Sequence, residues 1–256
     1  MIKHIVTDFD GTLTGAGGAE FPLNTFAVCL SGMKIRYNSV WTIATARTKK
    51  GMKIPIARLA RLNLLPDYII VRDGYIYKKN FLGYLPIVSW NFSVFTEKRN
   101  LLQQIIPTIK KLKIKINENY SQNIDFATKK HQLIYSFSNK ETLLKAKKYV
   151  SNELSNFPQV KTGIYNNKIY IYYQIYSKGE TIKYLNKKLE ILAKNVFAIG
   201  DSPNDLSMLH PEIAQMTACV GNADEKVKTK IKENKGYLAK KNFSQGIAES
   251  LEYFYN

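Results

Sequence analysis

Apolar and polar positions follow two rhythms along the first 80 residues of the chain. Short β-branched runs predict buried strands, and apolar residues at helical spacing predict helices between them. The expected strands are 2–8, 39–47 and 67–71, the expected helices are 22–33 and 52–64, and residues 72–77 form a turn into a hairpin. This alternation of strand and helix favours an α/β fold with a parallel sheet.

The rhythm changes between residues 80 and 176, where the pattern is typical of a small α+β insertion. In this block we expect helices around 97–111 and 140–154 and strands at 132–137 and 168–176. The α/β rhythm then resumes, with expected helices at 179–193, 223–233 and 243–255 and expected strands at 195–200 and 216–221. The chain is thus expected to form one core that is interrupted by a second, smaller one.

Two aspartates follow the first predicted strand, in the stretch DFDGT at 8–12. In a parallel α/β sheet, ligands bind outside the carboxyl ends of the strands, where Asp8 lies. Asp10 is two residues further on and can project to the same side, and Gly11 permits a tight turn. Two carboxylates so close together repel each other, and a bound cation removes that penalty. Oxygen ligands of this kind favour Mg²⁺.

Other metal or phosphate motifs do not fit this stretch. An EF-hand loop needs glycine where Leu13 stands and glutamate where Ala19 stands. The glycines at 15–18 lack the dinucleotide fingerprint, and no Walker lysine follows them. The chain has three histidines, so a histidine-rich metal site is not expected.

Three distant pieces complete a candidate phosphate site. They are Thr45 in ATAR, Lys178 in SKGET, and the pair Asp201 and Asp205 in GDSPND. Each piece alone is typical of a strand end, a solvated lysine or a turn. Together they indicate that acids hold a metal while a hydroxyl and an ammonium bind phosphoryl oxygens.

These four motifs, in this order, resemble the haloacid dehalogenase (HAD) superfamily. The layout is similar to its Cof-type and sucrose-phosphatase-like branch, in which an α/β cap is inserted before the motif lysine. The resemblance implies a Rossmann-like parallel-sheet HAD core at 1–79 and 177–256, with an α+β cap domain at 80–176. The chain departs from the branch at Ala46, where glycine is usual, and at Asp73, where asparagine is frequent.

The resemblance implies a phosphatase that works through an aspartyl phosphate. Asp8 is then the nucleophile, and Asp10 is the general acid that becomes the general base. Mg²⁺ is then held by Asp8, the backbone carbonyl of Asp10 and Asp201, with Asp205 beside the ion or one step further out. The substrate is expected to be a small phosphorylated metabolite, with a sugar phosphate as the first candidate.

The resemblance also implies residues that bind the substrate. The phosphate-binding set is Thr45, Lys178, Asn204, Gly11 and Thr12. In the cap, candidates to contact the leaving group are Trp90, Tyr120, Lys129, Lys130, His131 and Tyr135. A phosphomutase on a sugar phosphate is the near alternative, because relatives with a similar cap transfer the phosphoryl group to a sugar hydroxyl.

The formal net charge of +18 suggests a third interpretation, a polyanion-binding protein on an inactive hydrolase fold. The basic residues are spread along the chain, and Lys, Asn, Ile and Tyr are all abundant, so we favour compositional bias or steering of a small anionic substrate. We expect no nucleic-acid partner, no membrane span, a cytoplasmic location, and a monomer or homodimer. We expect no signal peptide, because the apolar run at the N-terminus is short and Asp8 interrupts it.

Overall fold

The computed structural model divides the chain into two compact units. The first is formed by Met1–Asn91 together with Tyr176–Asn256, and the second by Phe92–Ile175. The structure describes residues 1–15, 22–120, 126–129, 132–137, 139–165 and 167–255. The first division falls later than the expected boundary at residue 80, because the hairpin that follows residue 74 pairs with the sheet of the first unit.

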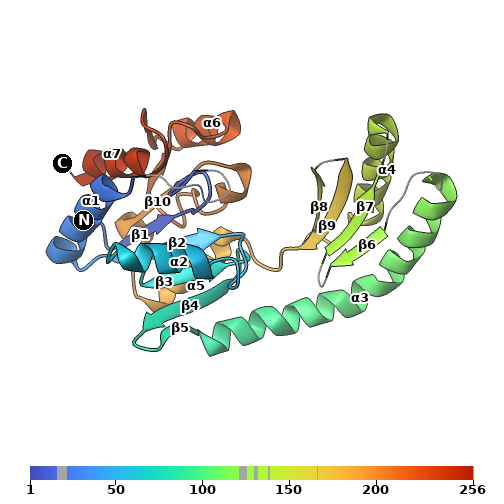
Figure 1. The fold of residues 1–256 in the computed structure, drawn as a ribbon, viewed down its shortest axis with the longest axis horizontal. Helices are drawn as coiled ribbons and strands as arrows, with labels where there is room; N and C mark the ends of the chain where they lie inside the picture. Colours follow the sequence, from blue (N-terminus) through green and yellow to red (C-terminus); the bar gives the residue numbers. More distant parts are fainter. Residues whose placement is uncertain (16–21, 121–125, 130–131, 138, 166, 256) are drawn as a thin grey trace. The chain divides into compact units, whose positions relative to one another are not determined.

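The first unit is built on one sheet of eight strands, in the order β12-β11-β10-β1-β2-β3-β4-β5 (Figure 1). The strands are β1 (His4–Thr7), β2 (Val40–Thr45), β3 (Tyr68–Val71), β4 (Tyr75–Asn80), β5 (Gly83–Pro86), β10 (Val196–Gly200), β11 (Met216–Cys219) and β12 (Tyr237–Leu238). Neighbouring strands from β12 to β3 pair in parallel, and β4 and β5 add an antiparallel edge. The predicted α/β fold with a parallel sheet is confirmed.

The central strands are buried on both faces, which is why apolar residues predominate in them. The helices of this unit are α1 (Asn24–Tyr37), α2 (Lys53–Arg61), α5 (Lys178–Lys188), α6 (Glu225–Glu233) and α7 (Phe243–Tyr255), with short 3-10 helices η2 (Ala193–Asn195) and η3 (Pro203–Asp205). Helices α1 and α7, from the two ends of the chain, pack against each other (Figure 1).

The second unit is an antiparallel sheet with two helices. Its strands are β6 (Phe126–Lys129), β7 (Gln132–Ser136), β8 (Val160–Tyr165) and β9 (Lys168–Tyr173), in the order β6-β7-β9-β8, and its helices are α3 (Val88–Tyr120), which starts in the first unit, and α4 (Lys140–Glu153). The expected strands correspond to β7 and β9, whereas β6, β8 and the short β12 were missed. The chain has no helix, in the part that the structure describes, with the length and apolar character needed to cross a bilayer.

Helix α3 extends beyond the expected 97–111 at both ends and contains Pro107. Its C-terminal part includes KLKIKI at 111–116, in which apolar residues alternate as in a strand. Leu112 and Ile116 are fully buried, whereas Ile114 between them is 58% exposed. Spacing by four residues therefore decides burial here, and the segment is helical.

A buried histidine joins three elements of the first unit. His4 on β1 contacts Asn186 on α5 through Nδ1 at 2.6 Å and Thr42 on β2 through Nε2 at 2.7 Å. The amide nitrogen of Asn186 donates to the carbonyl of Ile213, so its oxygen faces His4. Burial lowers the pKa of His4 from 6.5 to about 4, because water cannot solvate the imidazolium, although the Asn186 bond offsets part of this effect. The fold therefore requires the neutral imidazole.

We expect His4 to make the protein less stable in acid. A folded-state pKa below the unfolded value means that the stabilisation is complete above pH 6.5 and is lost as the pH falls toward 4. The loss in the free energy of unfolding is roughly 3 kcal/mol over that range. Urea unfolding of wild type and of His4→Gln at pH 7 and pH 4 measures it.

The variant His4→Gln should be less stable than wild type at pH 7 and should depend less on pH between 7 and 4. The exposed His210 provides the control, since His210→Gln makes the same chemical change without a buried site. An equal pH dependence in wild type and His4→Gln would contradict the assignment.

Candidate active site

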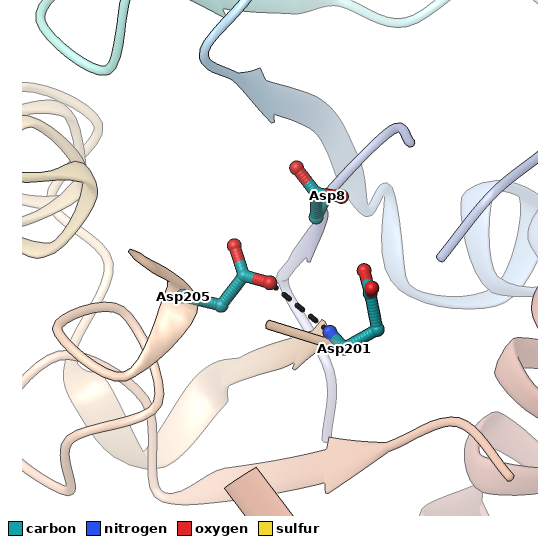
Figure 2. A group of neighbouring side chains, drawn as sticks. All are labelled: Asp8, Asp201 and Asp205. Carbon is teal, nitrogen blue, oxygen red and sulfur yellow. Dashed lines mark hydrogen bonds between the residues drawn. The ribbon is translucent and has the colours of Figure 1, made fainter. Parts of the chain in front are cut away.

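Three carboxylates converge where the strand order reverses in the first unit. Asp8 follows β1 and Asp201 follows β10, the neighbouring parallel strand, while Asp205 ends η3. One oxygen of each lies within 4.8 Å of one oxygen of both others. Figure 2 shows these side chains pointing toward a common space. The chain moves from β1 to β2 on one side and from β10 to β11 on the other, so this is the switch point at which α/β sheets bind ligands.

A lysine that follows the inserted unit along the chain links two of these acids. Lys178 Nζ donates to Asp8 Oδ1 and to Asp205 Oδ1, both at 2.6 Å, and its side chain is fully buried. Lys178 is the first residue of α5, whose N-terminus is fixed by a capping box between Ser177 and Glu180. The local sequence SKGE thus starts the helix at Lys178, the residue that contacts both acids.

The balance of charge in this cluster shifts the titration of its members. Burial raises the pKa of Asp8 to about 8, although the ammonium of Lys178 opposes the shift. Burial likewise raises the pKa of Asp201 to about 6. Burial alone would lower the pKa of Lys178, but Asp205 and Asp8 hold it above its ordinary value. Three carboxylates around one ammonium leave excess negative charge, which a bound cation would neutralise.

Asp205 is bound by the protein through both oxygens. Its Oδ1 accepts from Lys178, and its Oδ2 accepts from the backbone N–H groups of Asp201 and Ser202 at 3.0 Å. Figure 2 shows the bond from Asp201. This carboxylate therefore orients the lysine and closes the loop after β10. Asp8 and Asp201 are the better placed of the three to hold a cation directly, with Asp205 behind them.

The side chain of Asp10 pairs with an arginine. Arg47 Nε donates to Asp10 Oδ2 at 2.7 Å, and Arg47 Nη2 donates to Oδ1 at 2.6 Å. The guanidinium also lies over the ring of Phe9, with its carbon 5.1 Å from the ring centroid. Such a bidentate pair fixes the plane of the carboxylate. The expected role of the Asp10 backbone carbonyl as a metal ligand stays a prediction.

Arg47 was not predicted as a site residue, although it ends the ATAR motif that contains Thr45. Its backbone N–H donates to Thr45 Oγ1 at 3.1 Å. Thr45 is buried at the end of β2, and that bond leaves its hydroxyl hydrogen available for an incoming oxygen. The only signal for Arg47 was its position two residues after the strand end.

Other residues of the predicted phosphate set have different contacts. The hydroxyl of Thr12 donates to Asp201 Oδ1 at 2.6 Å, so it orients an acid. Asn204 is exposed and accepts a hydrogen bond from Ser202, and the residue against Lys178 is its neighbour Asp205. The expected role of Asn204 in phosphate binding stays a prediction.

Gly11 lies close behind Asp201. It has a φ of +88°, and a Cβ on it would lie 2.4 Å from Asp201 Oδ2. The turn after β1 can therefore pass this carboxylate only with glycine at position 11. Together with the oxygen chemistry of the three acids, this close cradle fits a small, hard divalent cation such as Mg²⁺.

The structure places the predicted cap residues in different environments. Trp90 belongs to the first unit, where its indole donates to the carbonyl of Gly74. Tyr135 is fully buried in the core of the second unit, so it packs there. Tyr120 ends α3 and Lys129 ends β6, whereas Lys130 and His131 lie outside the described residues.

Comparison with known proteins places these features in a family. A family model described as sucrose-6F-phosphate phosphohydrolase matches residues 2–255. A phosphoglycolate phosphatase of Picrophilus torridus is 26% identical over 263 residues, which cover 99% of this chain and 92% of that protein. A phosphoglycolate phosphatase of Methanobrevibacter smithii is 38% identical over 78 residues, which cover 30% of this chain and only 31% of the relative's length.

Solved structures share the fold. The sucrose-phosphatase of Synechocystis, in complex with sucrose and phosphate, superimposes with a TM-score of 0.66 at 16% identity over 99% of this chain and 98% of that one. TM0651 of Thermotoga maritima gives a TM-score of 0.65 at 19% identity, with 99% and 97% covered. At these sequence identities the similarity establishes the fold but not the substrate.

The substitution Gly11→Ala should disturb the carboxylate cluster as well as the backbone. A side chain at this φ destabilises the fold by about 1–3 kcal/mol, and its Cβ would displace Asp201. We expect Mg²⁺ to raise the melting temperature of wild type and to have no such effect on Gly11→Ala. Thermal unfolding with and without MgCl₂ measures both.

Gly83→Ala is the matched control. Gly83 also has a positive φ, +105°, but a Cβ there meets nothing within 4 Å. This variant should lose stability and keep the rise with Mg²⁺. A rise of the same size in Gly11→Ala would show that position 11 has no part in a cation site.

Proposed function

Because the chain belongs to the sucrose-6F-phosphate phosphohydrolase family, phosphatases of the HAD superfamily, we propose that it is a Mg²⁺-dependent phosphatase of small phosphorylated metabolites. The observation that carries this proposal is the buried contact of Lys178 with Asp8 and Asp205. This contact joins the proposed nucleophile Asp8, the proposed phosphate-binding ammonium of Lys178 and the carboxylate of Asp205 in one network.

In the proposed reaction Asp8 attacks phosphorus, and the leaving oxygen departs on the opposite side. Lys178 fixes one oxygen of Asp8, which leaves the other for attack. The ammonium of Lys178 and the hydroxyl of Thr45 then bind phosphoryl oxygens, whose charge is the main demand of this transition state. A bound Mg²⁺ neutralises charge on the phosphoryl group and favours the ionised form of the nucleophile.

Asp10 supplies the proton in the first half of this reaction and receives one from water in the second. Its bidentate pair with Arg47 orients the carboxylate for the second half, in which it acts as a base. In the first half one oxygen must carry a proton, so one of the two bonds from Arg47 has to open. Arg47 thus determines the orientation of Asp10 throughout.

The proposed substrate is a sugar phosphate. Two observations support this class. The family model, described as sucrose-6F-phosphate phosphohydrolase, matches nearly the whole chain, and the Synechocystis neighbour contains sucrose and phosphate. Phosphoglycolate is the second candidate, because relatives of that printed name align along most of this chain. A panel of hexose phosphates, sucrose 6-phosphate and phosphoglycolate distinguishes the two, and an isomerised ester in place of free phosphate would indicate a mutase.

The expected lack of a nucleic-acid partner and the expected oligomeric state stay predictions.

We expect Asp8→Asn to abolish turnover. The amide has no charge for attack on phosphorus, so release of inorganic phosphate from p-nitrophenyl phosphate and from the best panel substrate should fall to background. Glu212→Gln is the control, because it makes the same change on a side chain that is 71% exposed. Full activity of Asp8→Asn would refute the aspartyl-phosphate route. If neither Asp8→Asn nor Glu212→Gln released phosphate, the phosphatase itself would be refuted.

Binding of Mg²⁺ should release protons near neutral pH. The pKa values of about 8 for Asp8 and about 6 for Asp201 mean that, without a cation, Asp8 is largely protonated at pH 7. Since the cation binds carboxylates, its affinity should rise as the pH rises through this range and fall as the pH drops.

Titration calorimetry with MgCl₂ at pH 7, in two buffers that differ in ionisation enthalpy, measures this release. We expect a difference in heat that corresponds to up to about one proton. Equal heats in the two buffers would mean that the acids are already ionised.

A further inference from the structure

The turn at residues 72–74, between β3 and β4, holds two strained residues in succession. Arg72 has a φ of +51° and Asp73 a φ of +59°, in the left-handed region that glycine favours. Each such residue destabilises a fold unless its surroundings hold it there. The side chain of Asp73 is half-buried, and among the described residues its buried Oδ1 has no hydrogen-bond partner. Contacts with other elements hold this turn in place.

Two of these contacts lead to the phosphate-binding end of β2. The N–H of Arg72 donates to the carbonyl of Arg47 at 2.9 Å, and the N–H of Asp73 donates to the carbonyl of Thr45 at 3.2 Å. The turn therefore fixes the backbone at both residues whose side chains bind at the site. Its conformation therefore contributes to the position of Thr45.

A third contact leads to the helix that begins with Lys178. The hydroxyl of Thr181, one turn further along α5, donates to the carbonyl of Asp73 at 2.8 Å. Thr181 is fully buried. The turn thus connects the residue that supplies the hydroxyl with the helix that supplies the ammonium.

The fourth contact is made by Trp90. Its Nε1 donates to the carbonyl of Gly74 at 2.7 Å. Its ring stacks on Tyr184 of α5, with centroids 4.3 Å apart, and lies 4.6 Å from the ring of Tyr176. The chain leaves the first unit after Asn91 and returns at Tyr176. One side chain therefore contacts the turn, α5 and the returning segment, beside the point where the chain departs.

We propose that Trp90 is a positioning residue for phosphate binding, which acts through the 72–74 turn on Thr45 and Lys178. This inference rests on the proposed role of those two residues in the phosphatase. Trp90 satisfies the buried carbonyl of Gly74 and thereby holds the strained turn in place. Without that bond the turn can relax, and both phosphate-binding groups lose a backbone support.

The test compares two variants that each remove one side-chain bond to a carbonyl. Trp90→Phe keeps an aromatic ring and loses the N–H. Tyr84→Phe is the matched control, because it removes the bond from Tyr84 Oη to the carbonyl of Pro66, 2.6 Å long, in the same unit. Urea unfolding of the full chain measures the stability lost in each. Competition against p-nitrophenyl phosphate and calorimetry both measure the affinity for inorganic phosphate.

We expect Trp90→Phe to bind inorganic phosphate at least fivefold more weakly and to lower kcat, whereas Tyr84→Phe changes neither by more than twofold. Equal phosphate affinity in the two variants at similar stability would overturn the inference and leave the phosphatase intact. A wild type that hydrolyses no ester would refute the phosphatase, and calorimetry with phosphate would still test Trp90.

The variant Thr181→Val tests the same role of the 72–74 turn while Trp90 stays in place. It removes the bond from Thr181 Oγ1 to Asp73 and a further bond to the carbonyl of Ser177. We expect the same weakening of phosphate binding, and a double variant with Trp90→Phe should lose less than the sum of the two single losses. Additive losses would mean that the two residues act independently and not through the turn.

Discussion

The site depends on one interaction, the burial of the Lys178 ammonium between Asp8 and Asp205. A fully buried charge is costly unless its partners are fixed in good geometry, and here both partners lie at 2.6 Å. The lysine and Asp8 are separated by the whole inserted unit along the chain. The two halves of the first unit must therefore assemble around this lysine, and the contact couples the fold to the chemistry.

Close backbone approach makes that contact possible. The loop that carries Asp205 has to reach the N-terminus of α5, and a Cβ on Gly179 would lie 2.2 Å from the carbonyl of Ser207. Glycine directly after Lys178 thus lets the loop and the helix meet. The capping box at Ser177 and this glycine are adjacent, so one short stretch both starts the helix and admits its partner.

Much of this arrangement was predictable because it lies in local patterns. Buried strands, their polar ends and the four ordered motifs can all be identified in the sequence, and the structure brings Asp8, Asp201 and Asp205 together as expected. The pairing partners were not predictable. The contacts of Arg47 and Trp90 are recognisable only once the backbone has placed Asp10 and Gly74, because nothing in their spacing specifies a partner. Likewise, KLKIKI at 111–116 alternates as in a strand, and only packing in the second unit selects the helix.

The charges support the proposal that a divalent cation binds at this site together with phosphate. Four carboxylates, those of Asp8, Asp10, Asp201 and Asp205, face two basic groups, Lys178 and Arg47. A phosphate dianion that enters this set meets net repulsion, even though the whole chain carries a net charge of +18. The basic surface can raise the local concentration of an anion, but it acts from a distance and is screened by salt. A cation among the carboxylates themselves would reverse the local sign, so we expect metal and substrate binding to be coupled. Burial of these carboxylates is also the main cause of the raised pKa of Asp8.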